Sequence, residues 1–254
     1  MKTTVMGLCM GRNELTLSTW RENLKRAGAP YDLYITDQNE AVKNPEFKKE
    51  LESLGPKYTR FNVGNEGISR SLNQMMIRSA NPFYFFMPPD ILLPENWLAH
   101  LIDAIQSVPS SGIVGFLGQG LQLPKKEVNG LTIYSNCMDG PPKDGQALEN
   151  SQVLGAVGWS YQVVNKIGFF CEDYHPYGWE DADYCFRSQL AGFNNFLVDE
   201  QSIDLGNDYH QATMYSEIKK FMSLSNIGLH RWRAANYHII GLYEKAPIPK
   251  PPGV

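Results

Sequence analysis

The stretch Phe83-Tyr84-Phe85-Phe86-Met87-Pro88-Pro89-Asp90 contains the most informative strand ending in this chain. Its aromatic run, 83–87, has the composition of a buried β-strand. Pro88 and Pro89 lack the N–H groups that a sheet ladder needs, so the strand must end there and leave Asp90 at its rim. A lone Asp after a strand is otherwise a turn residue or a helix cap. Because ligands bind outside the carboxyl ends of strands in open α/β sheets, Asp90 is a candidate site residue.

A second stretch, Gly178-Trp179-Glu180-Asp181, places two adjacent carboxylates between an aromatic turn and a helix expected over 182–191. One acid that holds a metal ion and another that takes a proton are the parts needed to move a group off a diphosphate. The macrodipole of a helix start also favours acidic residues, which gives them a purely structural explanation. Trp179 and Tyr177 suit stacking on a sugar ring or packing in a core. The two stretches together indicate an enzyme.

The overall composition narrows the class of protein. The chain has 254 residues and a formal net charge of -4, so it has no overall basic footprint for nucleic acid. Its four cysteines show no CxxC spacing and are typical of a protein in a reducing compartment. No apolar run reaches the roughly 18 to 20 residues of a membrane span. We therefore expect a cytoplasmic protein without a transmembrane segment, in the host cytoplasm if the chain is viral.

Strand and helix signals alternate along the first half of the chain. Strands are expected over 3–9, 31–35, 58–63 and 83–87, and helices after Asn13, which can cap the first one, and over 45–54, 68–79 and 97–106. This alternation with short loops predicts a parallel sheet with helices on both faces.

The second half of the chain is less regular. Strands are expected over 113–117 and 196–198, loops and hairpins over 118–150, and helices over 215–225 and 231–243. We expect a single domain over 1–243, followed by a stiff Pro-rich tail over 244–254.

The order of these motifs resembles the family-2 glycosyltransferases with the GT-A fold. That family has an apolar strand, an Asp-x-Asp, a short apolar stretch, a Pro, and a Trp-Leu that starts a helix, and 83–98 follow this pattern. The resemblance covers roughly residues 3–213. Its other matching segments, in order, are 7–13, 36–39, 62–67 with Asn73, 155–168, and 177–192 with Asp183 and Arg187.

The resemblance implies a Rossmann-like three-layer α/β/α sandwich with a mostly parallel central sheet. It also implies a nucleotide-sugar-binding half over 1–110 and an acceptor-binding half over 111–243. The donor would be a nucleotide-diphosphate sugar. The residues that match the family's donor-binding positions are Arg12, Asn13, Asp37, Asn65, Gly67, Asn73, Pro89 and Asp90.

In the acceptor-binding half, the resemblance implies which residue takes the proton from the acceptor hydroxyl. Asp181 matches the family's general base, and its neighbour Glu180 is the second catalytic candidate. A base on the face opposite the leaving diphosphate would invert the anomeric carbon. Tyr177, Trp179 and Gly155 are the candidate acceptor residues. The acceptor itself stays open: a polysaccharide, a protein side chain and a hydroxymethylated DNA base of a phage all fit.

One departure from the family pattern concerns the metal. Where the family has Asp-x-Asp, this chain has Pro88-Pro89-Asp90, so the first carboxylate is missing. The resemblance implies Mn²⁺ or Mg²⁺ at Asp90, and such ions are often held by few carboxylates. His210 is the candidate for a family histidine that binds the metal or the diphosphate, and His230 is its rival. The missing Asp leaves two alternatives, a catalytically silent nucleotide- or sugar-binding relative and a nucleotidyltransferase.

Overall fold

The computed structural model describes residues 2–118, 124–135, 155–206, 214–242 and 244, and for 214–224 it describes the backbone alone. The strands are β1 (Thr3–Cys9), β2 (Tyr31–Gln38), β3 (Tyr58–Asn62), β4 (Phe83–Met87), β5 (Ile91–Leu92), β6 (Ser111–Gly118), β7 (Lys125–Val128), β8 (Leu131–Tyr134), β9 (Val157–Ser160) and β10 (Asn194–Asp204). The helices are α1 (Asn13–Lys25), α2 (Glu40–Lys43), α3 (Pro45–Ser53), α4 (Ile68–Ile77), α5 (Trp97–Ser107), α7 (Tyr161–Ile167), α8 (Glu180–Leu190) and α10 (Met214–Ile240).

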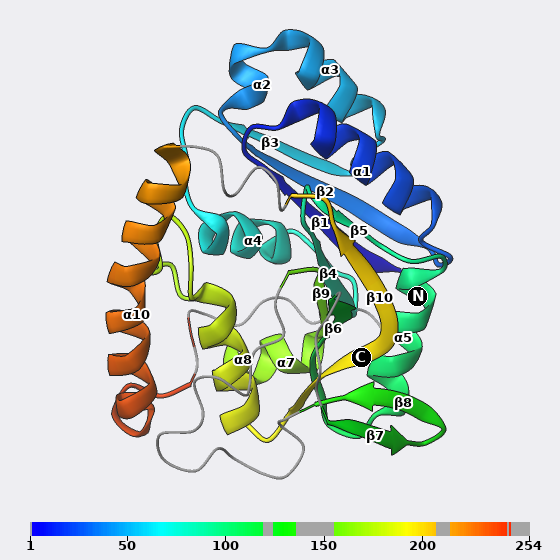
Figure 1. Ribbon diagram of the computed structural model, residues 1–254, viewed down its shortest axis with the longest axis vertical. Coiled ribbons are helices and arrows are strands. Elements are labelled where there is room, and N and C mark those ends of the chain that lie inside the picture. The colour runs from blue at the N-terminus through cyan, green and yellow to red at the C-terminus, as the bar shows by residue number, and fades with distance from the viewer. Residues whose placement is uncertain (1, 119–123, 136–154, 207–213, 243, 245–254) are drawn as a thin grey trace.

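One sheet forms the centre of the molecule, and helices cover both of its faces (Figure 1). Its strand order is β3-β2-β1-β4-β9-β6-β10-β8-β7, and β5 pairs with the end of β10. The first four strands, β6 and β10 all point the same way, while β9 runs antiparallel between β4 and β6. The expected three-layer α/β/α sandwich with a mostly parallel sheet is therefore confirmed.

Alternating side chains of the central strands divide the core into two hydrophobic clusters. Val5 of β1 and Phe85 of β4 face α1, α3 and α5, whereas Met6 and Tyr84 face α4, α7 and α8. Both faces of these strands are thus buried under helices, which explains why the strands are continuous apolar runs in the sequence.

Helix α1 holds in place the segment that follows β4 and contains Asp90. The indole N–H of Trp20 donates to the carbonyl oxygen of Pro88 at 3.1 Å. The side-chain amide of Asn23 donates to the carbonyl of Ile91 at 2.8 Å, and its oxygen accepts from the backbone N–H of Leu93 at 2.9 Å. These bonds satisfy backbone groups of Pro88, Ile91 and Leu93 after the strand has ended, so the rim after β4 has a defined path.

The expectation of two helices over 215–225 and 231–243 is wrong, because α10 is one continuous helix. Gly228 within it is exposed and adds only about 1 kcal/mol of helix penalty relative to Ala. Asn226 uses its side chain to bind a neighbouring turn rather than to break the helix. In the part of the chain that the structure describes, no helix is both long and apolar enough to cross a membrane.

Strand β10 is much longer than the expected 196–198. Its outer part, with the exposed residues Asp199 and Gln201, lacks the apolar pattern on which the prediction relied. Backbone pairing extends the strand instead, since Gln201 and Ser202 are in register with the end of β6 and Asp204 pairs with Ile91 of β5. This extension brings the end of β10 beside Asp90.

Candidate active site

The carboxyl edge of the sheet joins Arg12 and Asp90. Strands β1 and β4 are parallel neighbours, so the residues that follow them meet at the same edge. Arg12 adopts a left-handed conformation with a φ of 53° at the start of α1, and its Nη1 lies 2.9 Å from Asp90 Oδ2. Their side chains are only 13% and 18% exposed, so this ion pair lies in a partly buried rim rather than in open solvent.

Two further residues reach the same rim from the end of β10. The backbone N–H of Leu205 donates to the Asp90 carbonyl at 2.8 Å, which holds this segment against the turn after β4. A Cβ atom added to Gly206 would lie 2.7 Å from Asp90 Oδ2, 2.9 Å from Arg12 Nη1 and 3.2 Å from Asp204 Oδ1. Asp204 and Gly206 thus border the rim, and sequence reasoning missed both because β10 was expected to end at Val198.

Asn13 and Pro89 flank the Arg12–Asp90 pair in the sequence. The expectation that Asn13 caps α1 is wrong, because Arg12 occupies the N-cap position and Asn13 is already helical. Asn13 is the first helical residue, and its Oδ1 is buried without a hydrogen-bond partner among the described residues. Pro89 lies in the turn before Asp90 and is partly exposed.

Asp37 lies at the carboxyl end of β2 and is completely buried. One of its carboxylate oxygens accepts from the backbone N–H of Ala41 at 2.8 Å, and the other lies 3.4 Å from the thiol of Cys9. Burial raises the pKa of Asp37, although the bond from Ala41 opposes the shift. Asp37 therefore connects β1, β2 and α2, and a contact with a nucleotide base stays a prediction.

The polar loop over 62–67 is shaped by Gln38. The Gln38 amide oxygen accepts from the backbone N–H of Glu66 at 2.9 Å, and its nitrogen donates to the Gly67 carbonyl at 3.2 Å. Asn65 is exposed and its Oδ1 accepts from the Gly67 N–H at 2.9 Å. Gly67 has a φ of +82° and no space for a side chain, because a Cβ there would lie 2.8 Å from Nδ1 of His175. The loop thus contacts the segment that leads to the acidic turn.

Asn73 links the two halves of the chain. It is completely buried in α4, its amide nitrogen donates to the Phe170 carbonyl at 2.9 Å, and its oxygen accepts from the Phe170 N–H at 2.9 Å. The same nitrogen lies 3.0 Å from a carboxylate oxygen of Glu172. These bonds to protein groups hold α4 against the segment after α7, so Asn73 supports the site, and its contact with the donor stays a prediction.

The acidic turn leads directly into α8. Trp179 has a φ of 74° and precedes Glu180, the first residue of the helix. Asp181 is partly exposed, and its Oδ1 accepts from the backbone N–H of Ala182 at 2.8 Å. The surrounding protein raises the pKa of Asp181 by desolvation, and the bond from Ala182 offsets part of this shift. A carboxylate with a raised pKa is a better proton acceptor, as a general base must be.

The acidic turn lies at the same edge of the sheet as Asp90. Helix α8 packs on β10, which follows it after a short loop, so the helix runs opposite to the strand and begins at the strand's carboxyl end. The contact between Gly67 and His175 supports this placement independently. The structure therefore gathers most of the predicted site residues on one edge.

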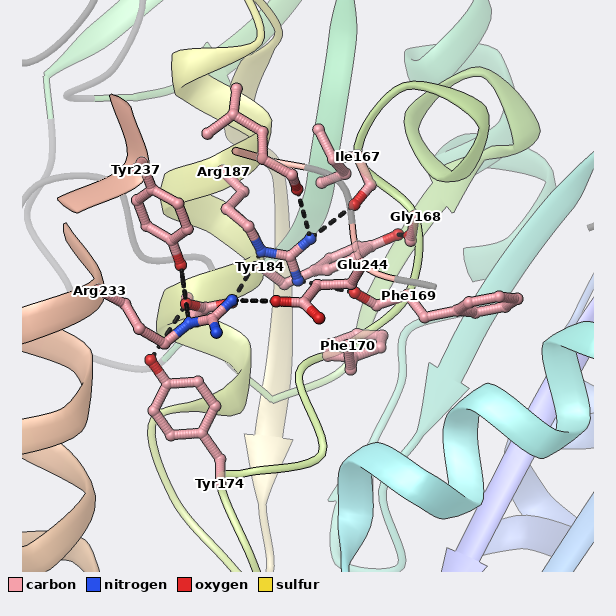
Figure 2. Close-up of polar contacts among 12 residues, drawn as sticks. Ile167, Gly168, Phe169, Phe170, Tyr174, Tyr184, Arg187, Arg233, Tyr237 and Glu244 are labelled. Carbon is pink, nitrogen blue, oxygen red and sulfur yellow. Dashed lines mark hydrogen bonds and ion pairs between the residues drawn. The ribbon is translucent and has the colours of Figure 1, made fainter. Parts of the chain in front are cut away.

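Figure 2 shows a buried polar network behind the turn, to which Tyr174, Arg187, Arg233 and Tyr237 contribute. Asp183 is the common partner of these four side chains and is completely buried. It accepts from Arg187 Nε at 2.8 Å, from Arg233 Nε at 3.1 Å and from the Tyr174 hydroxyl at 3.0 Å, and it also accepts from Tyr237. Burial acts to raise the pKa of Asp183, but the two guanidinium charges outweigh it and the pKa is lowered. The network joins α8 to α10 and supports the turn without facing solvent.

The remaining predicted residues are Gly155 and the two candidate histidines. Gly155 is exposed just before β9, with a φ of +81° and no neighbour within 4 Å of an added Cβ. His210 lies outside the described residues. His230, its rival, is buried in α10 beside Trp179. Within 2–118, 124–135, 155–206 and the described part of α10, no three His, Cys, Asp or Glu side chains form a group suited to a metal ion.

Comparison with known proteins identifies the fold. No protein-family model matches the sequence, and no curated protein matches it significantly. Solved structures do match: the mannosyltransferase PcManGT from Pyrobaculum calidifontis, in complex with GDP-Man and Mn²⁺, is similar with a TM-score of 0.59 and 13% identity over 80% of this chain. The chain spans 56% of that structure's length.

Two other matches have the same architecture. Residues 1–349 of S. aureus TarS give a TM-score of 0.55 at 14% identity, covering 94% of this chain and 75% of that one. GalNAc-T7 with UDP, GalNAc and Mn²⁺ gives 0.56 at 11% identity, covering 80% of this chain and 44% of that one. These similarities show that the chain has the GT-A fold.

Proposed function

We propose that this chain of GT-A fold is a glycosyltransferase that moves a sugar from a nucleotide-diphosphate donor to an acceptor hydroxyl with inversion. One observation carries the proposal: a single edge of the sheet presents the Arg12–Asp90 pair together with the acidic start of α8. A cation and a rim carboxylate suit a diphosphate and its ion, and Asp181 suits an acceptor proton. These are the chemical parts of sugar transfer from a diphosphate.

The donor is proposed to lie over the first half of the chain, 1–110, and the acceptor over 111–243. Structures of similar fold are described with GDP-Man or UDP, which supports a nucleotide donor here. Arg12 is the proposed partner of the diphosphate oxygens, because charge-assisted bonds from guanidinium to phosphate are strong and directional. The loop that Gln38 shapes is the proposed contact for the nucleoside.

We propose that a divalent ion binds at the rim beside Arg12. The carboxylates of Asp90 and Asp204 border the same space next to Gly206, and Mn²⁺ and Mg²⁺ prefer oxygen ligands of this type. We propose Asp90 as the protein ligand, with Asp204 in reach of the same region. Bonds to substrate phosphates and water complete the shell of such ions, so a missing first Asp is tolerated. When bound, the ion would stabilise the charge on the leaving diphosphate.

Asp181 is the proposed general base. As the acceptor oxygen forms its bond to the anomeric carbon, the bond from that carbon to the diphosphate oxygen breaks, and the hydroxyl proton passes to Asp181. The nucleoside diphosphate leaves with the electron pair, and Arg12 neutralises part of its charge. The raised pKa of Asp181 favours proton capture. Direct displacement from the opposite face inverts the sugar.

The proposal can be tested by donor hydrolysis. In this reaction water is the acceptor, so the natural acceptor need not be known. We would screen UDP- and GDP-linked sugars with Mn²⁺ for release of nucleoside diphosphate. Asp181→Asn should lower the release rate at least about 100-fold, the usual effect of losing a general base. Its donor affinity by calorimetry should stay unchanged, because Asp181 contacts the acceptor.

Glu180→Gln is the matched control, since it changes the neighbouring carboxyl in the same turn. A collapse in Glu180→Gln with normal release in Asp181→Asn would move the base one residue upstream. Normal release in both variants would refute the mechanism. Donor binding without any release, even with added saccharide, peptide or hydroxymethylated DNA acceptors, would favour a silent binding protein, the alternative that the missing first Asp suggests.

The cytoplasm is the proposed location. The described cysteines Cys9, Cys171 and Cys185 are all buried core residues, as expected for a protein in a reducing compartment.

A further inference from the structure

The turn that presents Asp181 has a backbone that needs support. Gly178 and Trp179 have φ values of 95° and 74°, in the left-handed region. Gly adopts this region freely, but a bulky residue such as Trp179 is strained there. The turn therefore keeps its shape only if surrounding contacts fix it. Those contacts come from α10, which lies along one side of the molecule next to α8 (Figure 1).

Asn226 of α10 binds the backbone of the turn. Its side-chain nitrogen donates to the carbonyl oxygens of Tyr177 at 3.0 Å and Gly178 at 3.1 Å. Asn226 is itself only 6% exposed, so these bonds form in a sheltered environment. The single side-chain amide of Asn226 thus bridges two successive carbonyls directly before Trp179, and it restrains both peptide planes.

His230, one helical turn further along, binds the side chain of the turn. Its ring stacks on the indole of Trp179, with centroids 5.3 Å apart and an interplanar angle of 28°. The ring is 1% exposed, and its Nδ1 lies 3.5 Å from the Tyr174 hydroxyl. Burial lowers the pKa of His230, although the nearby Asp183 carboxylate opposes the shift.

Helix α10 is in turn fixed to α8 by buried charges. Arg233 and Tyr237, both labelled in Figure 2, bond to Asp183, which follows Asp181 by two residues. Contacts from α10 therefore reach the backbone of the turn, the indole ring of Trp179 and the first helical turn of α8 behind it. This arrangement links the placement of Asp181 to the seating of α10.

We propose that Asn226 and His230 are positioning residues for proton transfer, acting through Trp179 and the carbonyls of the turn to aim Asp181 at the acceptor. The inference rests on the proposed role of Asp181 as the base. Asn226 and His230 are far from the acidic turn in sequence. Their proposed effect is on the rate of the chemical step and not on donor binding.

The test compares four variants of the whole chain in pairs. Asn226→Ala is matched by Asn236→Ala, which removes an exposed amide that bonds only to Trp232 of the same helix among the described residues. His230→Ala is matched by His238→Ala at an exposed position of the same helix. The measured quantities are the rate of nucleoside diphosphate release from the best UDP- or GDP-sugar with Mn²⁺, and the donor affinity by calorimetry.

Misplacing a catalytic group by about 1 Å slows a reaction by about 100-fold, so Asn226→Ala and His230→Ala should lose about 10- to 100-fold in rate at saturating donor. Their donor affinity should stay within about twofold, because they touch no donor-binding element. The controls should keep the wild-type rate. His230→Phe, which keeps a ring against Trp179, should restore most of the rate lost in His230→Ala, a rescue that general destabilisation would not give.

The outcomes separate this inference from the proposed function. Wild-type rates in Asn226→Ala and His230→Ala, alongside an inactive Asp181→Asn, would overturn the positioning role and leave Asp181 as the base. Normal release in both Asp181→Asn and Glu180→Gln would instead overturn the proposed mechanism on which this inference rests.

If His230→Ala fails to fold, the 19F spectrum of 5-fluorotryptophan-labelled protein decides. The Trp179 resonance, assigned with Trp179→Phe, should shift in Asn226→Ala and not in Asn236→Ala. An unchanged resonance in Asn226→Ala would refute the contact.

Discussion

Replacing Asp183 by Asn tests the buried network that joins α8 to α10. Asn has nearly the same shape, so the substitution removes the negative charge without opening a cavity. Asp183 is 0% exposed, and it is the common partner of Arg187 and Arg233. The variant therefore leaves two buried guanidinium groups without their shared carboxylate.

The expected loss of stability in Asp183→Asn depends on the bonds that each guanidinium group keeps. Removing one partner of a buried ion pair is destabilising by about 3–5 kcal/mol. Arg187 keeps bonds to the carbonyls of Ile167, Phe169 and Leu242, and Arg233 keeps its pair with Glu244 (Figure 2). These remaining bonds favour the lower end, and we expect a loss of about 3 kcal/mol. For a chain of this size, that corresponds to a fall in Tm of about 6–12 °C.

The assay is thermal and urea unfolding followed by circular dichroism. Glu50→Gln is the control, because Glu50 pairs with Arg21 at 3.5 Å on the exposed surface, where such pairs contribute less than about 1 kcal/mol. A fall in Tm of similar size in both variants, or a loss below about 1 kcal/mol in Asp183→Asn, would refute the reasoning.

The same network predicts how stability depends on pH. The folded pKa of Asp183 is lowered below its ordinary value of about 3.9. The stabilisation by the ionised carboxylate is therefore fully present above that value and is lost as pH falls through the folded pKa. The difference in unfolding free energy between wild type and Asp183→Asn should thus be constant from pH 7 to about pH 4 and shrink below it. A difference that grows on acidification would contradict the assigned sign.

Three further predictions concern the site and the core. Gly206→Ala should weaken Mn²⁺-dependent donor binding in calorimetry with little change in Tm, because its Cβ would lie 2.7 Å from Asp90 Oδ2; unchanged binding would place the ion elsewhere. Gly7→Ala should lower the free energy of unfolding by about 1–3 kcal/mol, since its Cβ would lie 2.7 Å from the buried ring of Trp20; a neutral result in urea unfolding would mean that the ring shifts freely. In the pH profile of donor hydrolysis, the pKa on the acidic side should lie above the ordinary carboxyl pKa of about 3.9, because the raised pKa of Asp181 keeps the base protonated until a higher pH. An acidic-side pKa at or below about 3.9 would exclude Asp181 as the base.

The regular half of the fold could be predicted from local patterns. The strands β1 and β4 and the helices α3 and α5 begin and end within one residue of the expected positions, because apolar periodicity, Gly and Pro mark them in the sequence. The outer part of β10 and the continuity of α10 could not be predicted in this way. Partners distant in the chain decide both elements, the first through pairing with β5 and β6 and the second through bonds to the acidic turn.

The same division applies to the site. Local patterns predicted that Asp90 follows a strand at a rim and that Glu180 and Asp181 lie next to a helix start, because prolines and acidic helix starts act over a few residues. Three contacts could be seen only in the folded chain: Arg12 pairs with Asp90, Asp204 and Gly206 border the same space, and His230 stacks on Trp179. Such contacts depend on strand order and helix packing, which no local pattern encodes.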